Sequence, residues 1–397
     1  MYTYPLLQRV SELYSEAELS NVLLLACQHL LEPQQRMFEH LIKLGLKPEN
    51  CVIVGKNYST NSEVLKKLCD LGCVVAPFSD KFEAEQPFDQ WFENRLTSFI
   101  SAEISCRPMG EYRKVIILDD GGFMHLIVDK LCGQNSNIVG VEQTSSGHHR
   151  IKAHGVHFPF ISVARSYHKL LYESPYIGIN GKVRIVKHLR KVGNTTPRIL
   201  FLGLGPIGRL VAGQLLFVEK HEGCVFDPKF DEMRYGSRDQ ACRGVFDFLR
   251  PEHVLRSEDL TSRLQEFDVV VGSTGTSVLT EIDIERLHPS TTLISMSSSD
   301  REFPAVPFRH NRGHVHENYK LGGRTLVNGG FPITFDGRSH GMPPAQIELT
   351  ISLLMIRVLS EVAVHLQSLP HAIDQIHKMW RPDEEEKQWY ETLNSLD

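Results

Sequence analysis

The sequence lacks several features that would assign it to a membrane or metal-binding class. Its 397 residues contain no apolar run close to the ~20 residues of a membrane-spanning helix. Its eight cysteines form no C-x-x-C pair, and its histidines show no spacing typical of a metal site. The net charge of −5 gives no reason to expect nucleic acid or a membrane as a partner. With no secretory pattern in residues 1–9, we expect a cytoplasmic protein with reduced cysteines and no metal.

The most informative stretch is residues 199–209, which read ILFLGLGPIGR. A short apolar run of strand type precedes Gly203, Gly205 and Gly208 in G-x-G-x-x-G spacing, and a helical pattern follows. Gly203 permits a tight turn, Gly205 lets the backbone approach a pyrophosphate, and Gly208 lets the helix pack close to the strand. The amide-rich start of the helix would point at the phosphates. A plain strand-turn-helix unit is the alternative.

Two further patterns strengthen the prediction of a dinucleotide site. Asp227 ends an apolar run about 20 residues after the glycines, where an acid would bind the ribose hydroxyls of NAD and disfavour NADP. The alternative is a turn residue before Pro228. A later strand pattern, residues 267–272, leads into another turn of small residues. The cofactor-binding residues predicted from these patterns are Gly203, Gly205, Pro206, Ile207, Gly208, Asp227, Thr274 and Gly275.

The N-terminal half alternates strand and helix patterns. Apolar runs occupy residues 21–27, 51–55, 72–76, 114–118 and 138–141. This alternation predicts parallel βα units and an α/β fold: two Rossmann-like parallel-sheet domains, with the NAD-binding domain inserted in a substrate domain. The expected ranges are 1–180 for the first part of the substrate domain, 181–335 for the NAD-binding domain, and 336–397 for C-terminal helices that return to the substrate domain.

Polar residues follow several of these predicted strands, where a parallel sheet places its ligand-binding groups. They are His29, Ser59, Thr60, Asp119, Asp120, Glu142 and Gln143. Simpler interpretations stay open for some of them. The alternative for His29 is a hydrogen-bonded histidine at a strand end. Asp119 and Asp120 are also typical of a helix cap, and Asp120 is the one favoured for function. Lys169 and Glu173, four residues apart, are typical of a solvated ion pair on a helix.

Several segments together resemble the S-adenosylhomocysteine hydrolase family. They are LDDGG at 118–122, GVEQTSSGHHR at 140–150, ISVARSYHK at 161–169, the glycine motif at 203–208, VNGG at 327–330 and AQIEL at 345–349. The resemblance implies that bound NAD transiently oxidises a substrate hydroxyl. It implies catalytic roles for Lys169, Asp120, His29 and Glu173, and substrate contacts for Glu142 and Gln143, beside those expected of Ser59 and Thr60. It also places Thr144, Ser145, Ser146 and Asn328 at the cofactor.

The departures from the family pattern concentrate in nucleoside recognition. Gln143 stands where the family has a glutamate, and about Ser298 where it has a histidine near the nicotinamide. Residues 331–340 replace the loop that closes on adenine, and the family's C-terminal tail is absent. We therefore expect an adenosylhomocysteinase-like enzyme with NAD, a small-molecule substrate of altered, nucleoside-like or thioether type, and a homo-oligomer, with a dimer favoured. The alternative is an inactive NAD-binding member with a regulatory or scaffolding role.

Overall fold

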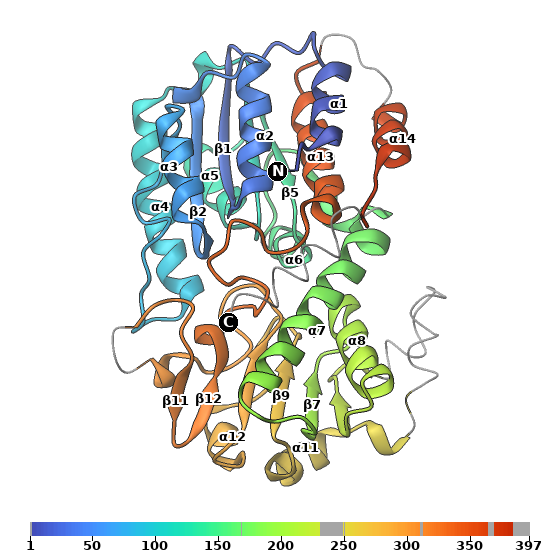
Figure 1. Ribbon diagram of the computed structural model, residues 1–397. Coiled ribbons are helices and arrows are strands. Elements are labelled where there is room, and N and C mark those ends of the chain that lie inside the picture. The colour runs from blue at the N-terminus through green and yellow to red at the C-terminus, as the bar shows by residue number, and fades with distance from the viewer. Residues whose placement is uncertain are drawn as a thin grey trace. The chain divides into compact units, whose positions relative to one another are not determined.

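The computed structural model describes residues 2–167, 169–230, 249, 251–309, 313–363 and 369–383 (Figure 1). The chain forms two compact units. Unit 1 comprises residues 1–81, 92–173 and 337–397, and unit 2 comprises residues 82–91 and 174–336. Most of unit 2 is therefore an insertion between two parts of unit 1. Residues 384–397, where we expected no counterpart of the family's tail, lie outside the described residues.

Unit 1 contains a six-stranded parallel sheet with the order β3-β2-β1-β4-β5-β6. The strands are β1 (Val22–Leu30), β2 (Cys51–Thr60), β3 (Val74–Val75), β4 (Lys114–Asp119), β5 (Ile138–Glu142) and β6 (Phe160–Ser162). The helices are α1 (Pro5–Leu13), α2 (Glu32–Lys43), α3 (Ser62–Asp70), most of α4 (Phe88–Cys106), α5 (Phe123–Cys132), α6 (Ser145–His154), α13 (Pro344–Ser360) and α14 (Leu369–Met379). The strand order reverses direction between β1 and β4, and ligands of such sheets bind at this switch point.

The last part of the chain completes unit 1. Helix α13 packs against α1, α2 and α14. The buried carboxylate of Glu348 on α13 accepts hydrogen bonds from the backbone N–H groups of Leu6 and Leu7, at 2.7 and 3.2 Å. These two amides belong to the first turn of α1, whose N–H groups have no partner within the helix. Glu348 therefore caps α1 and ties it to α13.

Unit 2 contains a second six-stranded sheet, with the order β11-β12-β10-β9-β7-β8. Its strands are β7 (Ile199–Leu202), β8 (Gly223–Phe226), β9 (Val269–Gly272), β10 (Thr292–Ser295), β11 (Tyr319–Leu321) and β12 (Arg324–Leu326). All pairs are parallel except β11 with β12. Its described helices include α7 (Ser174–Lys191), α8 (Pro206–Gly213), α11 (Ser257–Arg263) and α12 (Glu281–Arg286). The switch point of this sheet lies between β7 and β9.

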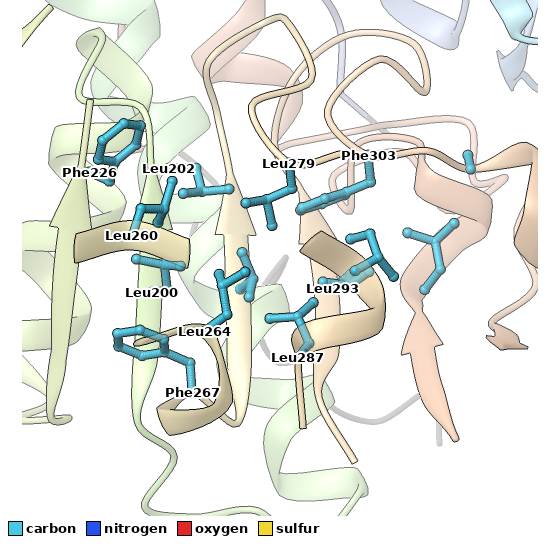
Figure 2. Packing of buried hydrophobic residues seen from close by; sticks show 14 of the residues in the cluster. Leu200, Leu202, Phe226, Leu260, Leu264, Phe267, Leu279, Leu287, Leu293 and Phe303 are labelled. Carbon is cyan, nitrogen blue, oxygen red and sulfur yellow. The ribbon is translucent and has the colours of Figure 1, made fainter. Parts of the chain in front are cut away.

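The sheet of unit 2 is buried on both faces. Successive residues of one strand join opposite clusters: Phe201 packs in one. Leu200 and Leu202 pack in the other, which Figure 2 shows. This alternation follows from the two-residue period of a strand, and burial on both faces explains the continuous apolar run that identified β7 in the sequence. The predicted α/β class with two Rossmann-like parallel sheets is confirmed. Among the described helices, none is both long and apolar enough to cross a membrane.

Candidate functional site

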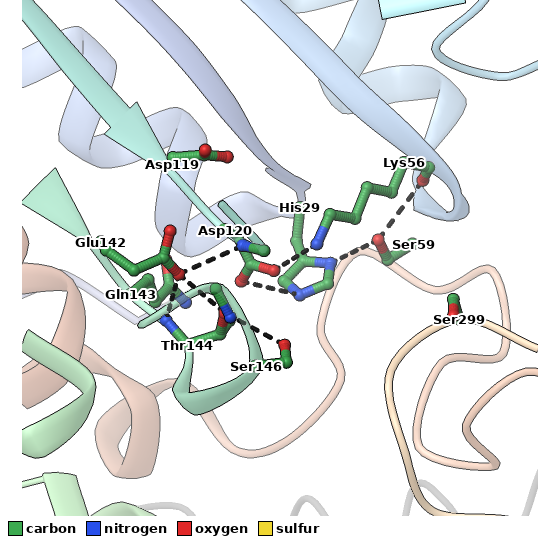
Figure 3. Close-up of polar contacts among 12 residues, drawn as sticks. His29, Lys56, Ser59, Asp119, Asp120, Glu142, Gln143, Thr144, Ser146 and Ser299 are labelled. Carbon is green, nitrogen blue, oxygen red and sulfur yellow. Dashed lines mark hydrogen bonds and ion pairs between the residues drawn. The ribbon is translucent and has the colours of Figure 1, made fainter. Parts of the chain in front are cut away.

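The switch point of unit 1 brings three predicted residues together (Figure 3). His29 comes from β1, Ser59 from β2, and Asp120 from the residue after β4. His29 Nε2 lies 3.3 Å from Asp120 Oδ2, and His29 Nδ1 lies 2.5 Å from Ser59 Oγ. His29 retains 12% side-chain exposure, whereas Asp120 retains 2%. The histidine is therefore the member of this group that a ligand can reach.

Lys56 is the residue of this site that sequence reasoning missed. The predicted strand ended at residue 55, but β2 continues to Thr60 and carries Lys56 into the interior. Its ammonium group forms an ion pair with Asp120 Oδ1, and its side chain is only 4% exposed. The sequence offers one signal for this role: Lys56 directly follows four apolar strand residues and a glycine. A lysine inside a buried strand indicates an ion pair, because buried lysines are rare unless they are paired.

The pKa of Asp120 follows from these neighbours. Burial alone would raise it, but the charge of Lys56, then the charge and hydrogen bond of His29, hold the pKa well below its usual range. Burial lowers the pKa of Lys56, whereas the charge of Asp120 raises it. The net effect is a pKa above the ordinary value of a lysine. Both groups are therefore charged at neutral pH.

The hydroxyl groups near Lys56 serve the local structure. Thr60 Oγ1 donates to the carbonyl oxygen of Lys56 at 2.9 Å, and Ser59 Oγ lies 3.3 Å from the same oxygen. These bonds fix the end of β2, which is bulged where Thr60 pairs with Leu30. Ser59 is only 2% exposed, so it lies behind His29 as seen from solvent. The structure thus places the predicted substrate residue Ser59 as a partner of the histidine.

Glu142, at the end of β5, organises the turn that follows it. Its Oε1 accepts hydrogen bonds from the amides of Gly121 (3.1 Å) and Thr144 (2.6 Å) and from Thr144 Oγ1 (2.7 Å). Thr144 is the N-cap of α6 and accepts from the Gly147 amide at 3.0 Å. Ser145 begins α6, and Ser146 Oγ lies 3.4 Å from Thr144 Oγ1. All these residues belong to unit 1, and their described contacts are structural.

A second buried carboxylate, Asp119, lies beside Glu142. Asp119 Oδ2 accepts from the amide of His125 at 3.1 Å and lies 2.9 Å from His125 Nδ1. Glu142 Oε2 lies 3.8 Å from the same ring nitrogen. Burial, then the charge of Asp119, raises the pKa of Glu142 to about 8. The three side chains lie close enough together, within 4.8 Å, for a metal ion, yet a hydrogen bond already joins His125 to Asp119.

Lys169 and Glu173 lie in a π-helical segment, Lys169–Glu173, with 14% and 7% side-chain exposure. Lys169 Nζ donates to the carbonyl oxygen of Gln143 at 2.8 Å and lies 3.4 Å from Glu173 Oε1. Glu173 Oε2 accepts from the hydroxyl of Thr350 on α13. The pair is therefore largely buried, and the interpretation as a solvated pair is wrong. Sequence spacing found the pair but not its link to Gln143.

Residues 337–340, the end of the segment 331–340 that we expected to replace the closing loop, contact residues that follow β1 and β2 in unit 1. The amide of Glu32 donates to the carbonyl oxygen of Ser339 at 2.8 Å, and Asn61 Nδ2 donates to that of Gly337 at 3.0 Å. His340 Nε2 lies 3.1 Å from Glu32 Oε2. Residues 337–340 are therefore anchored just after β1, the strand that carries His29, and just after β2.

The three glycines of unit 2 have the geometry that their spacing predicts. Gly203 has φ +93°, and a Cβ there would lie 2.8 Å from Ser273 and Thr274 atoms at the end of β9. A Cβ at Gly208 would collide with Ser273 Oγ and the carbonyl oxygen of Gly203. At Gly205, by contrast, an added Cβ meets nothing within 4 Å. Gly203 and Gly208 are needed for packing, and Gly205 leaves open space at the start of α8, where Pro206 and Ile207 follow.

Asp227 lies directly beside this loop. Its Oδ2 accepts from the amide of Leu204 at 2.7 Å, and its Oδ1 accepts from that of Lys229 at 2.8 Å. Each carboxylate oxygen has a second lone pair, so ribose hydroxyl groups can still donate to it. The half-buried acid, the open space at Gly205 and the helix start fit a dinucleotide bound at the switch point of unit 2.

The second predicted turn of this unit depends on a residue that the sequence did not reveal. Glu302 is 1% exposed and accepts hydrogen bonds from the Gly275 amide and, at 3.0 Å, from Thr274 Oγ1. Burial raises the pKa of Glu302.

Asn328 has φ 53°, and its Nδ2 donates to the carbonyl oxygens of Pro332 and Phe335, each at 2.8 Å. The described contacts of Asn328 stabilise the following loop.

Comparisons with known proteins place the chain in a family. No protein-family model matches it. Two proteins of Mycobacterium tuberculosis, Uncharacterized protein MT0113 (strain CDC 1551 / Oshkosh) and Uncharacterized protein Rv0104 (strain ATCC 25618 / H37Rv), are each 31% identical over 371 residues, which cover 91% of this chain and 68% of theirs. Similar solved structures include the dipicolinate synthase A chain from Bacillus subtilis (11% identity, TM-score 0.40, covering 87% of this chain and 98% of that one). Another is a D-isomer specific 2-hydroxyacid dehydrogenase family protein from Aeromonas salmonicida (13% identity, TM-score 0.30, covering 72% of this chain and 74% of that one). At 31% identity over most of its length, the chain belongs to the same family as the two Mycobacterium tuberculosis proteins.

Proposed function

We propose that the protein is an NAD-linked enzyme that transiently oxidises a hydroxyl group of a small substrate, as the resemblance to S-adenosylhomocysteine hydrolase implies. The observation that carries the proposal is the glycine loop of unit 2. A Cβ added at Gly203 or Gly208 would collide with neighbouring atoms, whereas a Cβ added at Gly205 would meet nothing within 4 Å. Asp227 lies beside this loop at the switch point of the sheet. This combination supports NAD, because the acid would accept from ribose hydroxyls and would repel the extra phosphate of NADP.

Unit 2 would hold the cofactor through Gly205, the first turn of α8 and Asp227. When bound, NAD accepts a hydride from the carbon that bears the hydroxyl group and later returns it. The protein must then take up the hydroxyl proton and hold it for return. The residues of unit 1 that we assign to this task are His29 and Lys169, whose side chains retain 12% and 14% exposure.

The substrate itself differs from adenosylhomocysteine in this proposal. Gln143 can hydrogen-bond a hydroxyl group but cannot take its proton, unlike the glutamate it replaces. Residues 337–340 also fix a different loop beside β1, through Glu32 and Asn61. A lost partner for a buried polar group costs about 1–3 kcal/mol, so several such changes weaken adenosine binding by orders of magnitude. A nucleoside-like or thioether substrate with other ring contacts remains within the same chemistry.

The test is the cofactor content of the purified chain. We expect NAD(H) in the supernatant after denaturation, in a ratio near one per chain, and more after incubation with NAD+. Adding candidate hydroxyl-bearing thioethers and nucleosides, adenosine included, should then produce the absorbance of reduced nicotinamide with at least one of them. Lys169→Met and His29→Gln would test the chemical step. Absence of NAD(H) even after incubation would overturn the proposal. Bound NAD(H) that no substrate reduces would instead support the non-catalytic alternative.

A further inference from the structure

Glu302 places a buried carboxylate at the strand ends of unit 2 without a cation beside it. The residue is 1% exposed, its Oε1 accepts a hydrogen bond from the amide of Gly275, and its Oε2 accepts one from Thr274 Oγ1 at 3.0 Å. A Cβ added to Gly272, the last residue of β9, would lie 2.7 Å from Oε2, so the carboxylate packs against the end of this strand. Within the part of the chain that the structure describes, Glu302 forms no ion pair.

The hydrogen-bond partners of Glu302 are neutral groups. Burial raises its pKa, and hydrogen bonds from Ser297 and from the turn at 274–275 oppose the rise without reversing it. Asp120 of unit 1 is equally buried, but the charge of Lys56 holds its pKa below the usual range. A buried carboxylate without a cation is costly, because it has lost water and gained no opposite charge. Glu302 therefore suits a ligand that brings a positive charge, and such a ligand would favour its ionised form.

The strand order indicates which half of NAD would lie on the side of Glu302. The sheet runs β8-β7-β9-β10 through its switch point, and a dinucleotide lies across such a point with one nucleotide on each side. Asp227 follows β8, and an acid at this position binds the ribose of the adenosine half. The nicotinamide half would then lie on the side of β9 and β10, where Glu302 packs against Gly272.

We propose that Glu302 sets the preference of unit 2 between the oxidised and the reduced cofactor. The nicotinamide ring is a cation in NAD+ and neutral in NADH, so a buried carboxylate on its side of the sheet stabilises bound NAD+ more than bound NADH. Glu302 acts here through its charge and transfers no proton. In a cycle that returns its hydride, this preference keeps the resting enzyme oxidised. The inference deepens the proposed function and rests on it for the identity of the cofactor.

The test measures the ratio of NAD+ to NADH that the full-length chain binds. The chain is equilibrated with an excess of both nucleotides in equal amounts, free nucleotide is removed, and the bound forms are separated by chromatography after denaturation. Glu302→Gln removes the charge and keeps the size of the side chain, so the ratio should fall at least about threefold. Ser297→Ala removes a neutral donor, and Glu285→Gln removes an exposed charge of α12; both should keep the wild-type ratio. A damaged turn would weaken both nucleotides alike, so the ratio separates charge from a structural role.

A folded Glu302→Gln chain with the wild-type ratio would overturn the inference. If Glu302→Gln does not fold, Glu302→Asp and Glu302→Asn form a second pair of equal size that differs in charge, and equal ratios for these two would overturn it as well. A wild-type chain that binds neither nucleotide would overturn the proposed function together with this inference. Bound nucleotide with a ratio that Glu302 does not affect would overturn this inference alone, so the two failures are distinguishable.

Discussion

The switch points of the two units differ in whether side chains or backbone groups form them. In unit 1 the strand ends carry ionisable side chains, and the buried Asp120 contacts both Lys56 and His29. In unit 2 the corresponding position is mostly backbone and glycine, and Asp227 accepts a hydrogen bond from the amide of Leu204 in the loop. Side chains that carry charge suit proton chemistry, whereas an open backbone turn suits a phosphate group. The difference supports a division of roles, with substrate chemistry in unit 1 and cofactor binding in unit 2.

The largest expected effect breaks the ion pair of unit 1. Lys56→Met leaves Asp120 buried without its cation, which should lower the free energy of unfolding by about 3–5 kcal/mol. Urea titration followed by circular dichroism measures it. Removing both charges, in Lys56→Met with Asp120→Asn, should cost clearly less. A single variant that is as stable as the wild type would show that the pair is not the dominant buried charge of unit 1.

Glu142 provides a pH test of the same unit. Its pKa is raised from about 4.3 in an unfolded chain to about 8 in the folded one. Its contribution to stability is therefore complete below pH ~4.3 and is lost as the pH rises towards 8, at up to about 1.4 kcal/mol per pH unit. Between pH 5 and 8 Asp120 stays ionised, because its pKa is lowered. Urea titrations across this range should show the decline in wild type and a flatter profile in Glu142→Gln.

Gly208 tests the packing of unit 2. Its added Cβ would collide with Ser273 Oγ and the carbonyl oxygen of Gly203, so Gly208→Ala should lower stability by about 1–3 kcal/mol. Gly213 lies on the same helix with nothing within 4 Å of an added Cβ, and Gly213→Ala is the matched control. Equal melting temperatures for the two variants would contradict the close approach of α8 to β7 and β9.

These cases also show which features a sequence can reveal. The glycine loop lies within eleven consecutive residues, and the buried strands are continuous apolar runs, so both could be predicted locally. The Lys56–Asp120 pair joins positions 64 residues apart, and Glu302 reaches a turn 27 residues before it. Such contacts follow from strand order, which the sequence did not specify. The predicted strand also ended before Lys56, because a lysine is not expected inside a buried strand.

The smallest expected effect compares helix caps in the two units. Thr144 caps α6 and also donates to Glu142, whereas Thr280 caps α12 in a reciprocal pair with Asp283. Thr280→Ala should cost about 1 kcal/mol. Thr144→Ala should cost more, because it also removes a donor from a buried carboxyl group. Thermal unfolding of both variants measures the difference, and a larger loss at Thr280 would contradict the organising role given to Glu142.

The most direct test of the division of roles is calorimetric titration of NAD+ into Gly205→Val and Gly213→Val. Both glycines leave open space for a Cβ, and neither has a positive φ, so both variants should fold. Gly205→Val fills the space proposed for the pyrophosphate and should weaken NAD+ binding at least tenfold, about 1.4 kcal/mol, while Gly213→Val should bind as the wild type does. Equal affinity of the two variants for NAD+ would contradict cofactor binding at the glycine loop of unit 2.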